Sequence, residues 1–175
     1  YLELIHRIDR DTSGLVMISK KRSTLKLLQD MLRELKIKKT YAAVVKGQVS
    51  LDKQLIDAPL HRYELANGER RVRVSKEGKE SKTQWNVQER FMHATLVYAS
   101  PLSGRTHQIR VHGLSIGHPL IGDDKYGHET EYKGPAARRL CLHALRLEIP
   151  GYPTIEAPLP EDMQNLVAQL RAQSK

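Results

Sequence analysis

The sequence predicts an α+β fold, an antiparallel or mixed sheet with helices on its flanks. Apolar runs of strand length and stretches with helical spacing are interspersed along the chain. Most of the predicted strands are joined by connections of hairpin length, which favour antiparallel pairing. The chain has 175 residues, of which 39% are hydrophobic, and this suffices for one sizeable core. We therefore expect one domain over residues 1–175.

The first part of the chain predicts a strand, a helix and a second strand. Residues 14–19 form a short β-rich apolar run that starts at a glycine, which is typical of a buried strand. A helix follows, because leucines recur at helical spacing between charged residues, with Ser23 as the expected N-cap. These leucines are Leu25, Leu28, Leu32 and Leu35. Residues 41–45 form the second strand, which ends at Gly47.

The middle of the chain predicts four extended segments. An Asn-Gly turn at residues 67–68 is expected to join segments at residues 53–57 and 70–75. Two longer strands are expected at residues 81–89 and 93–99.

The last part predicts a short helix, a strand and a C-terminal helix. After a turn at residues 101–104, Thr106 is expected to cap a helix that runs to Ser115. Residues 140–149 are expected to form a strand. Pro160 is placed at the first position of the last helix, whose first turn is acidic.

The composition excludes several classes of protein. Cys141 is the only cysteine, so neither a disulfide framework nor a cysteine-based zinc site can form within the chain. No apolar run approaches the ~20 residues that span a bilayer, and no signal peptide opens the chain. We expect a soluble, cytoplasmic protein.

The charge balance is basic, with 29 Lys and Arg against 20 Asp and Glu and a formal net charge of +9. Basic clusters of this kind are what a phosphate backbone contacts, although a merely solvated surface gives the same pattern. They comprise residues 20–22, Lys36, Lys38, Lys39, Arg70, Arg71 and Arg73. Aromatic residues are only 5% of the chain, which speaks against a sheet that stacks bases on paired aromatics.

A first candidate site is the basic loop at residues 6–14, between two predicted strands. Its arginines stabilise the ionised carboxylate of Asp9, which is then suited to act as a nucleophile or a base. The alternative is a loop aspartate that accepts hydrogen bonds from backbone amides ahead of Gly14. Thr12 and Ser13 are interpreted as turn formers, because no His/Asp relay is evident from the spacing.

A second candidate site is residues 103–112. In the predicted helix, Arg110 lies on the face of His107, so basic groups converge and can bind a phosphate or pair with a carboxylate. His107, His112 and His118 could form a metal set, but structural roles are the better interpretation because no cysteine or patterned carboxylate accompanies them. Tyr41, at the start of a strand, is by itself a core tyrosine.

Taken together and in order, these segments resemble the RluA family of pseudouridine synthases, most closely its RluC/RluD-like members that modify large-subunit ribosomal RNA. Residues 6–14 (HRIDRDTSG) resemble the family's catalytic loop HRLDxxTSG. Four further segments continue the match in order: residues 41–47 (YAAVVKG), 104–112 (GRTHQIRVH), 117–127 (GHPLIGDDKYG) and 139–144 (RLCLHA).

The resemblance implies a role for each matching residue. Asp9 is the catalytic aspartate, which attacks the target uridine or removes a ribose proton. Tyr41 packs against the uracil and helps to remove the C5 proton, and Arg110 forms the ion pair that orients Asp9. Arg7 inserts into the RNA where the target nucleotide is flipped out of its stack.

Further basic residues are expected to bind the RNA under the same resemblance, mostly through phosphates. They are Lys38, Lys39, Arg70, Arg71, Arg73, Arg105 and His107. The fold implied is a mixed, bent sheet with a central active-site cleft. The reaction is an isomerisation without net redox change, so no cofactor and no metal are expected. RNA is the expected partner, and the protein is expected to be a monomer.

Two departures from the family pattern stand out. Ile8 replaces the usual leucine, a near-isosteric change that we expect to be harmless. The chain also opens in a strand-like run without an initiator methionine and lacks the family's first strands and its S4-type RNA-binding domain. We therefore expect a fragment of a longer protein.

Two other functions remain open at this stage. A metal-dependent RNA phosphodiesterase could hold Mg²⁺ through a set of carboxylates. These are Asp9, Asp11, Asp123 and Asp124. A non-catalytic RNA-binding or ribosome-assembly module would use the same loops only to position RNA.

Overall fold

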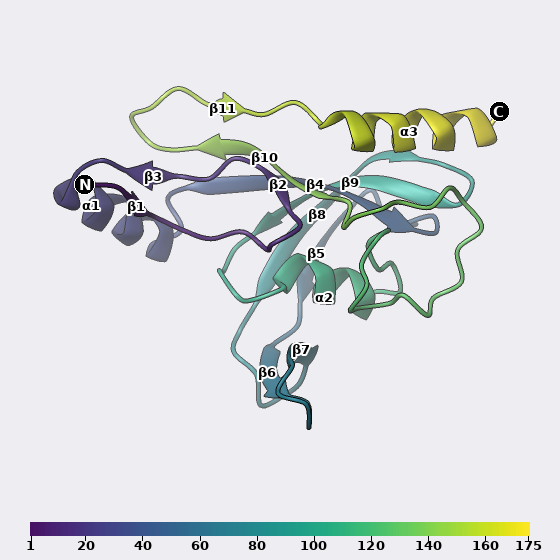
Figure 1. Cartoon of the computed structure of the whole chain (residues 1–175), viewed down its shortest axis with the longest axis horizontal. Helices are drawn as coiled ribbons and strands as arrows, with labels where there is room; N and C mark the ends of the chain where they lie inside the picture. The colour runs from purple at the N-terminus through teal and green to yellow at the C-terminus, as the bar shows by residue number, and fades with distance from the viewer.

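A computed structural model describes residues 1–175 (Figure 1). The helices are α1 (Arg22–Arg33), α2 (Gln108–Ser115) and α3 (Glu161–Gln173). The strands of the main sheet are β2 (Ser13–Gly14), β4 (Lys38–Lys46), β5 (Lys53–Asp57), β8 (Lys82–Arg90), β9 (Ala94–Pro101), β10 (Leu142–Glu148) and β11 (Ile155–Glu156). Their order is β11-β10-β4-β9-β8-β5, and β2 also pairs with β10. Only the β2–β10 pairing is parallel, so the predicted α+β class with a mixed, mainly antiparallel sheet is confirmed.

Strand β4 lies in the middle of the sheet, because it is an apolar run with neighbours on both edges and cover on both faces. Residues 40–45 are all buried. Tyr41 lies opposite Ala99 of β9 on one side and Ala144 of β10 on the other. A strand enclosed in this way needs a continuous apolar run rather than an alternating one.

The two faces of the sheet carry separate cores, because successive side chains of a strand point to opposite faces. Tyr41 and Ala43 belong to one cluster together with Ile109 of α2. Ala42 and Val44 belong to a second cluster, which side chains of α3 complete. Figure 1 shows α3 along one face of the sheet and α2 on the opposite side. Tyr41 therefore points to the face that α2 covers.

A two-stranded hairpin, β6 (Leu60–Glu64) and β7 (Arg70–Val74), projects beyond α2 (Figure 1). It is attached by a small apolar cluster in which Val72 packs with Val111 of α2 and with Tyr126. The hairpin is therefore held against the same helix that covers the Tyr41 face of the sheet.

The N-terminal segment forms a second two-stranded sheet, in which β1 (Glu3–Leu4) pairs with β3 (Ile18–Ser19). Met17 and Leu28 of α1 are buried with Leu147 of β10, so this unit is packed on the end of the main sheet. None of the helices has the length and apolar composition needed to cross a bilayer.

Most of the predicted elements are confirmed. The strands expected at residues 41–45, 81–89, 93–99 and 140–149 are β4, β8, β9 and β10, and the C-terminal helix is α3. Pro160 is the N-cap of α3 rather than its first helical residue. Long apolar segments were predicted correctly because their own side chains supply most of the burial.

The single buried strand expected at residues 14–19 is wrong. The structure has two strands of two residues, β2 and β3, separated by a non-regular segment. Gly14 has φ +107°, and the chain leaves β10 after it to pair with β1 instead. The physical reason is that Val16 and Ile18 are exposed while Met17 and Ser19 are buried, so the run alternates between exposed and buried positions instead of being buried throughout.

The expected pairing of residues 53–57 with 70–75 is also wrong. Strand β7 pairs with β6, which was not predicted, and β5 pairs with β8 at the edge of the main sheet. The turn at residues 67–68 is in the hairpin, so only its partner strand was misassigned.

Two helix caps were misplaced by one or two residues. Lys21 is the N-cap of α1, and Ser23 lies in the first turn. His107, not Thr106, is the N-cap of α2 and adopts a left-handed conformation with φ 54°. Neither cap makes a side-chain hydrogen bond to its helix, so the side-chain chemistry that guided the prediction is absent.

We predict that Gly14→Ala lowers the free energy of unfolding by about 3 kcal/mol or more, because a left-handed residue and a steric overlap are combined. An added Cβ would overlap the backbone carbonyl of Ala144, which cannot move without breaking the β2–β10 pairing. Urea denaturation measures the loss. Gly68→Ala is the control, since Gly68 has φ +84° with open space around it and should lose only about 1 kcal/mol. Equal losses in both variants would contradict the close packing at Gly14.

Candidate active site

The loop from His6 to Thr12, between β1 and β2, carries Asp9, and its Ile8 packs against the core cluster on the Tyr41 face of the sheet. The amide of Thr12 donates to the carbonyl of Asp9 at 3.0 Å, which closes a turn directly after the aspartate. The loop then ends in β2, which pairs with His143 and Ala144 of β10. Asp9 is therefore held on a short turn whose far end is part of the sheet.

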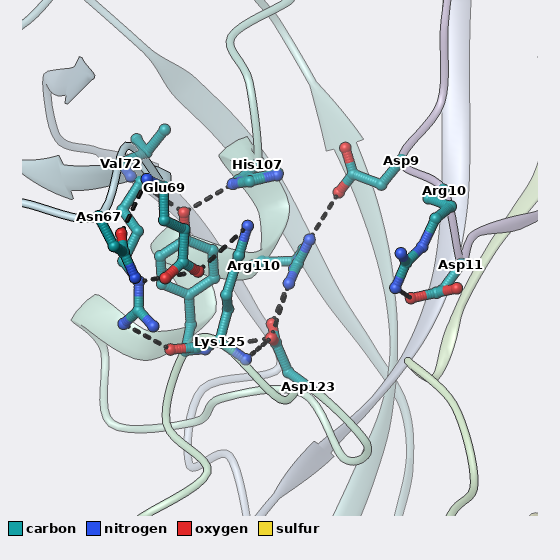
Figure 2. Close-up of polar contacts among 12 residues, drawn as sticks. Asp9, Arg10, Asp11, Asn67, Glu69, Val72, His107, Arg110, Asp123 and Lys125 are labelled. Carbon is teal, nitrogen blue, oxygen red and sulfur yellow. Dashed lines mark hydrogen bonds and ion pairs between the residues drawn. The ribbon is translucent and has the colours of Figure 1, made fainter. Parts of the chain in front are cut away.

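Arg110 of α2 makes a two-pronged ion pair with Asp123. Its Nε donates to Asp123 Oδ2 at 2.8 Å, and its Nη2 donates to Asp123 Oδ1 at 2.7 Å (Figure 2). The Asp123 side chain is fully buried, and 8% of the Arg110 side chain is exposed. Asp123 Oδ1 also accepts the amides of Lys125 and Tyr126 at 3.0 and 3.1 Å. The guanidinium is thereby fixed in one orientation.

The third nitrogen of that guanidinium is directed at Asp9. Arg110 Nη1 lies 3.3 Å from Asp9 Oδ2, and Figure 2 shows the guanidinium between the two carboxylates. The Asp9 side chain is 25% exposed, in contrast to that of Asp123. One edge of the Asp9 carboxylate is thus bound by Arg110 while the group stays accessible from solvent.

The ion pair shifts the pKa of both buried partners. Burial by itself raises the pKa of Asp123, but the hydrogen bonds and charge of Arg110 and the two backbone amides outweigh it, so the pKa is lowered. Burial likewise opposes the charged form of Arg110, but Asp123 and Asp9 raise its pKa. Both groups are charged at neutral pH.

A cleft of about 1390 Å³ runs past Asp9, and a smaller pocket of about 90 Å³ shares part of its lining. Asp9, Arg7, Lys39, Arg105 and His107 line both, Arg110 lines the cleft, and Tyr41 lines the smaller pocket. The structure therefore brings most of the predicted catalytic and RNA-binding residues to one opening.

Lys39 and Tyr41 are two residues apart in β4 and therefore lie on the same face of the sheet, where both side chains line this opening. Burial, together with the charge of Asp9, raises the pKa of Tyr41 to about 12. The phenol is therefore protonated at neutral pH. Burial lowers the pKa of Lys39. Burial, together with the charge of Lys39, lowers the pKa of His6 to about 4.

Four of the predicted RNA-binding residues lie outside the cleft. Lys38 is exposed next to Lys39 but lines neither opening. The other three are on β7 of the hairpin. Arg70 lies 3.9 Å from Glu64, Arg71 pairs with Glu69 and the Lys125 carbonyl, and Arg73 lies over the ring of Tyr63. Because Arg71 is engaged with protein groups, the three do not form one uniform strip.

Sequence reasoning missed three residues that border the cleft or its ion pair. Arg62 lines the cleft from β6, a strand that was not predicted. Lys125 lines the cleft as well, and Tyr126 packs its ring against the guanidinium of Arg110 at 5.1 Å. Lys125 and Tyr126 fell within a segment quoted for its resemblance, so a signal was present, but their position depends on long-range packing.

The carboxylates considered for a metal site are not brought together. Asp9 and Asp123 both contact the guanidinium of Arg110, and Asp11 pairs with Arg10. No group of three His, Cys, Asp or Glu side chains is arranged to hold a metal ion. The histidine set is dispersed too, since His112 bonds with Thr83 and Ala58, and His118 with the Lys46 carbonyl.

A second network anchors the end of the Asp9 loop. Arg139 donates to the carbonyl of Asp11 and to Ser13 Oγ, each at 3.1 Å. The same side chain donates to both carboxylate oxygens of Asp162 in α3. Ser13 Oγ also lies 2.8 Å from His143 Nδ1 of β10. The loop is therefore tied to α3 and β10 as well as to α2.

The chain is similar in sequence to known RNA-modifying proteins. The profile of a family described as RNA pseudouridylate synthase matches residues 1–115. Proteins named ribosomal large subunit pseudouridine synthase C from Haemophilus ducreyi and Yersinia pestis are 46% and 48% identical, over 99% and 98% of this chain. The aligned region is 57% and 56% of those relatives, so the chain spans a little over half of their length.

Two solved structures are similar in fold. Human RNA Pseudouridylate Synthase Domain Containing 1 superimposes with a TM-score of 0.77 and 25% identity, over 98% of this chain and 81% of that one. Human RNA Pseudouridylate Synthase Domain Containing 4 gives a TM-score of 0.81 and 25% identity, over 97% and 76%. Sequence and fold thus agree on one family.

We predict that Asp123→Ala lowers the free energy of unfolding by about 3 to 5 kcal/mol, because it leaves the buried Arg110 without its main partner. Urea denaturation at pH 7 measures this loss. Glu89→Ala is the matched control, since it removes an ion pair with Arg171 that lies at the surface and should cost much less. Equal losses in the two variants would contradict the stabilising role of the buried pair.

We also predict that the Asp123 contribution is lost in acid. The pKa of this carboxyl is lower in the folded than in the unfolded state, where it is about 4. The stabilisation is therefore fully present above pH about 4 and disappears as the pH falls through the lower folded value. Unfolding measured from pH 7 to 2 should show a steeper acid loss for the wild type than for Asp123→Asn. Parallel curves would contradict the assignment.

Proposed function

Because the chain belongs to the RNA pseudouridylate synthase family, we propose that it converts specific uridines of RNA to pseudouridine. The single observation that carries the proposal is an accessible carboxylate, Asp9, held by the buried Arg110 at the edge of a basic cleft. The reaction breaks the bond between N1 of uracil and C1′ of ribose and joins C5 to C1′. One proton leaves C5 and one is gained at N1, so atoms and charge balance without a redox or metal cofactor.

Asp9 is proposed as the catalytic residue, acting as the nucleophile or as the base that removes a ribose proton. Arg110 orients it, because one guanidinium nitrogen donates a hydrogen bond to the carboxylate. Tyr41 lines the small pocket together with Asp9, and its proposed role is to pack against the uracil. Because its raised pKa keeps the phenol protonated, packing is favoured over direct removal of the C5 proton.

The basic residues of the cleft are proposed to bind the RNA. A uridine in structured RNA must leave its stack before its base can be rotated, and Arg7 lies beside Asp9 at the entrance where a displaced nucleotide would enter. Lys39, Arg105 and His107 line the same entrance. Lys38 and the hairpin arginines Arg70, Arg71 and Arg73 extend the proposed contact surface beyond it.

We propose 23S ribosomal RNA of the large subunit as the substrate, because the relatives carry that subunit in their names. We further propose that the protein acts as a monomer in the cytoplasm without a bound metal. The alternative that remains is a non-catalytic RNA-binding module, which the basic cleft alone would also serve.

We predict that the wild type releases tritium from ribosomal RNA that contains [5-³H]uridine, since C5 loses its proton during isomerisation. Release should persist in EDTA and should be abolished in Asp9→Asn, a variant with nearly the same side-chain shape. RNA affinity should change little in that variant. A folded wild type that releases no tritium from ribosomal, precursor-ribosomal or transfer RNA would exclude the synthase and leave the binding module. Loss of release in EDTA would contradict the proposal that no metal is needed.

We predict that Arg105→Ala weakens RNA binding at all sites and lowers the slope of log affinity against log salt by about 1, because one phosphate contact is lost. Fluorescence anisotropy with a ribosomal RNA fragment at several KCl concentrations measures both. Lys175→Ala is the control, because Lys175 is past the end of α3 and lines neither the cleft nor the small pocket. An unchanged slope in Arg105→Ala would show that Arg105 contacts no phosphate.

A further inference from the structure

The hydroxyl of Tyr126 joins the hairpin to the edge of the cleft. It accepts a hydrogen bond from the amide of Val72 in β7 at 3.0 Å and lies 2.6 Å from Nδ1 of His107. Tyr126 is only 5% exposed. The single hydrogen of the hydroxyl has one acceptor within reach, His107 Nδ1, because the amide of Val72 can only donate.

This arrangement selects one tautomer of His107. If Nδ1 carried the ring hydrogen, the hydroxyl hydrogen of Tyr126 would be buried without an acceptor, which is unfavourable. Nδ1 therefore accepts from Tyr126, and Nε2 carries the ring hydrogen. The hydroxyl of Tyr126 thus decides which side of the imidazole is a donor.

The ring is neutral and held in a fixed position. The pKa of His107 is lowered, mainly by burial and also by the charges of Arg110 and Lys125. The charges of Asp9 and Asp123 act in the opposite direction but do not outweigh these effects. The backbone of His107 is left-handed, with φ 54° and ψ 23°, a conformation that side chains other than glycine rarely adopt. Its ring packs edge-on against that of Tyr126 with centroids 5.3 Å apart.

The nitrogen that carries the hydrogen faces the opening. Figure 2 shows one ring nitrogen of His107 at its dashed contact and the other ring nitrogen on the side of Asp9. His107 and Asp9 line the cleft and the small pocket together, and Nε2 has no hydrogen-bond partner within the protein. A lone pair in this place would repel both the carboxylate and any oxygen of a bound nucleotide, whereas an N–H attracts them.

We propose that His107 donates a hydrogen bond from Nε2 to an oxygen of the target uridine beside Asp9, and that Tyr126 is the positioning residue that fixes this donor. The inference rests on the proposed function. A neutral donor binds the nucleotide without adding a second cation against Asp9, so the carboxylate stays paired with Arg110 alone. Because the same hydroxyl accepts from Val72, the position of the hairpin and the direction of the donor are coupled.

Three variants test the proposal by tritium release from [5-³H]uridine-labelled ribosomal RNA. Tyr126→Phe keeps the ring against Arg110 and removes only the hydroxyl, and we expect kcat to fall by about 10- to 100-fold with little change in KM. His107→Asn suits the left-handed backbone but reaches only the Nδ1 position, so it should lose as much. His107→Gln places its amide nitrogen near the Nε2 position and should retain most of the activity.

Nitrogen-15 NMR of the histidine rings provides a readout that a merely structural role would not change. The wild type should show His107 with a protonated Nε2 and an unprotonated Nδ1, and Tyr126→Phe should show a mixture of tautomers. Wild-type protein with a protonated Nδ1 would overturn the proposal. So would full tritium release by both Tyr126→Phe and His107→Asn, while the proposed function would stand. No release by the wild type would overturn both.

Discussion

Burial of the Arg110 guanidinium between Asp123 and Asp9 is the constraint on which the rest of the site depends. A guanidinium removed from water is tolerated only if its nitrogens are bonded to charged partners. Asp123 supplies two of these bonds and is itself held by backbone amides, so only one edge of the guanidinium remains for Asp9. The loop that carries Asp9 therefore has one low-energy position. The buried Arg110–Asp123 ion pair thus determines where the accessible carboxylate of Asp9 lies.

The sheet places this pair next to an apolar floor. Alternation along β4 sends Tyr41 toward the site and Ala42 toward α3, so one strand serves the pocket and the opposite core at once. Helix α2 also contributes to both the core and the site, because Ile109 packs on the sheet while Arg110 pairs with the carboxylates of Asp9 and Asp123. Packing and electrostatics therefore cannot be altered independently at this point of the molecule.

Much of the fold was predictable, and the reasons for the failures are physical. Strand β4 and helix α3 carry their own apolar signal, whereas the two residues of β2 are a strand only because β10 lies beside them. Strand β6 was missed because only Leu60 in it is buried. At the site, Asp9, Tyr41 and Arg110 were assigned through resemblance. Asp123 was considered only as a metal ligand, because nothing local shows that a cation from α2 lies opposite.

The contacts that hold the Asp9 loop have a consequence for the order in which the site can form during synthesis. Asp9 is bonded to a residue 101 positions later, and Ser13 to one 130 positions later. During synthesis from the N-terminus, α2, the 122–127 segment and β10 leave the ribosome long after the loop has emerged. The loop must wait unanchored until these partners arrive. A nascent chain that is released early therefore carries the Asp9 loop without the contacts that hold it in place.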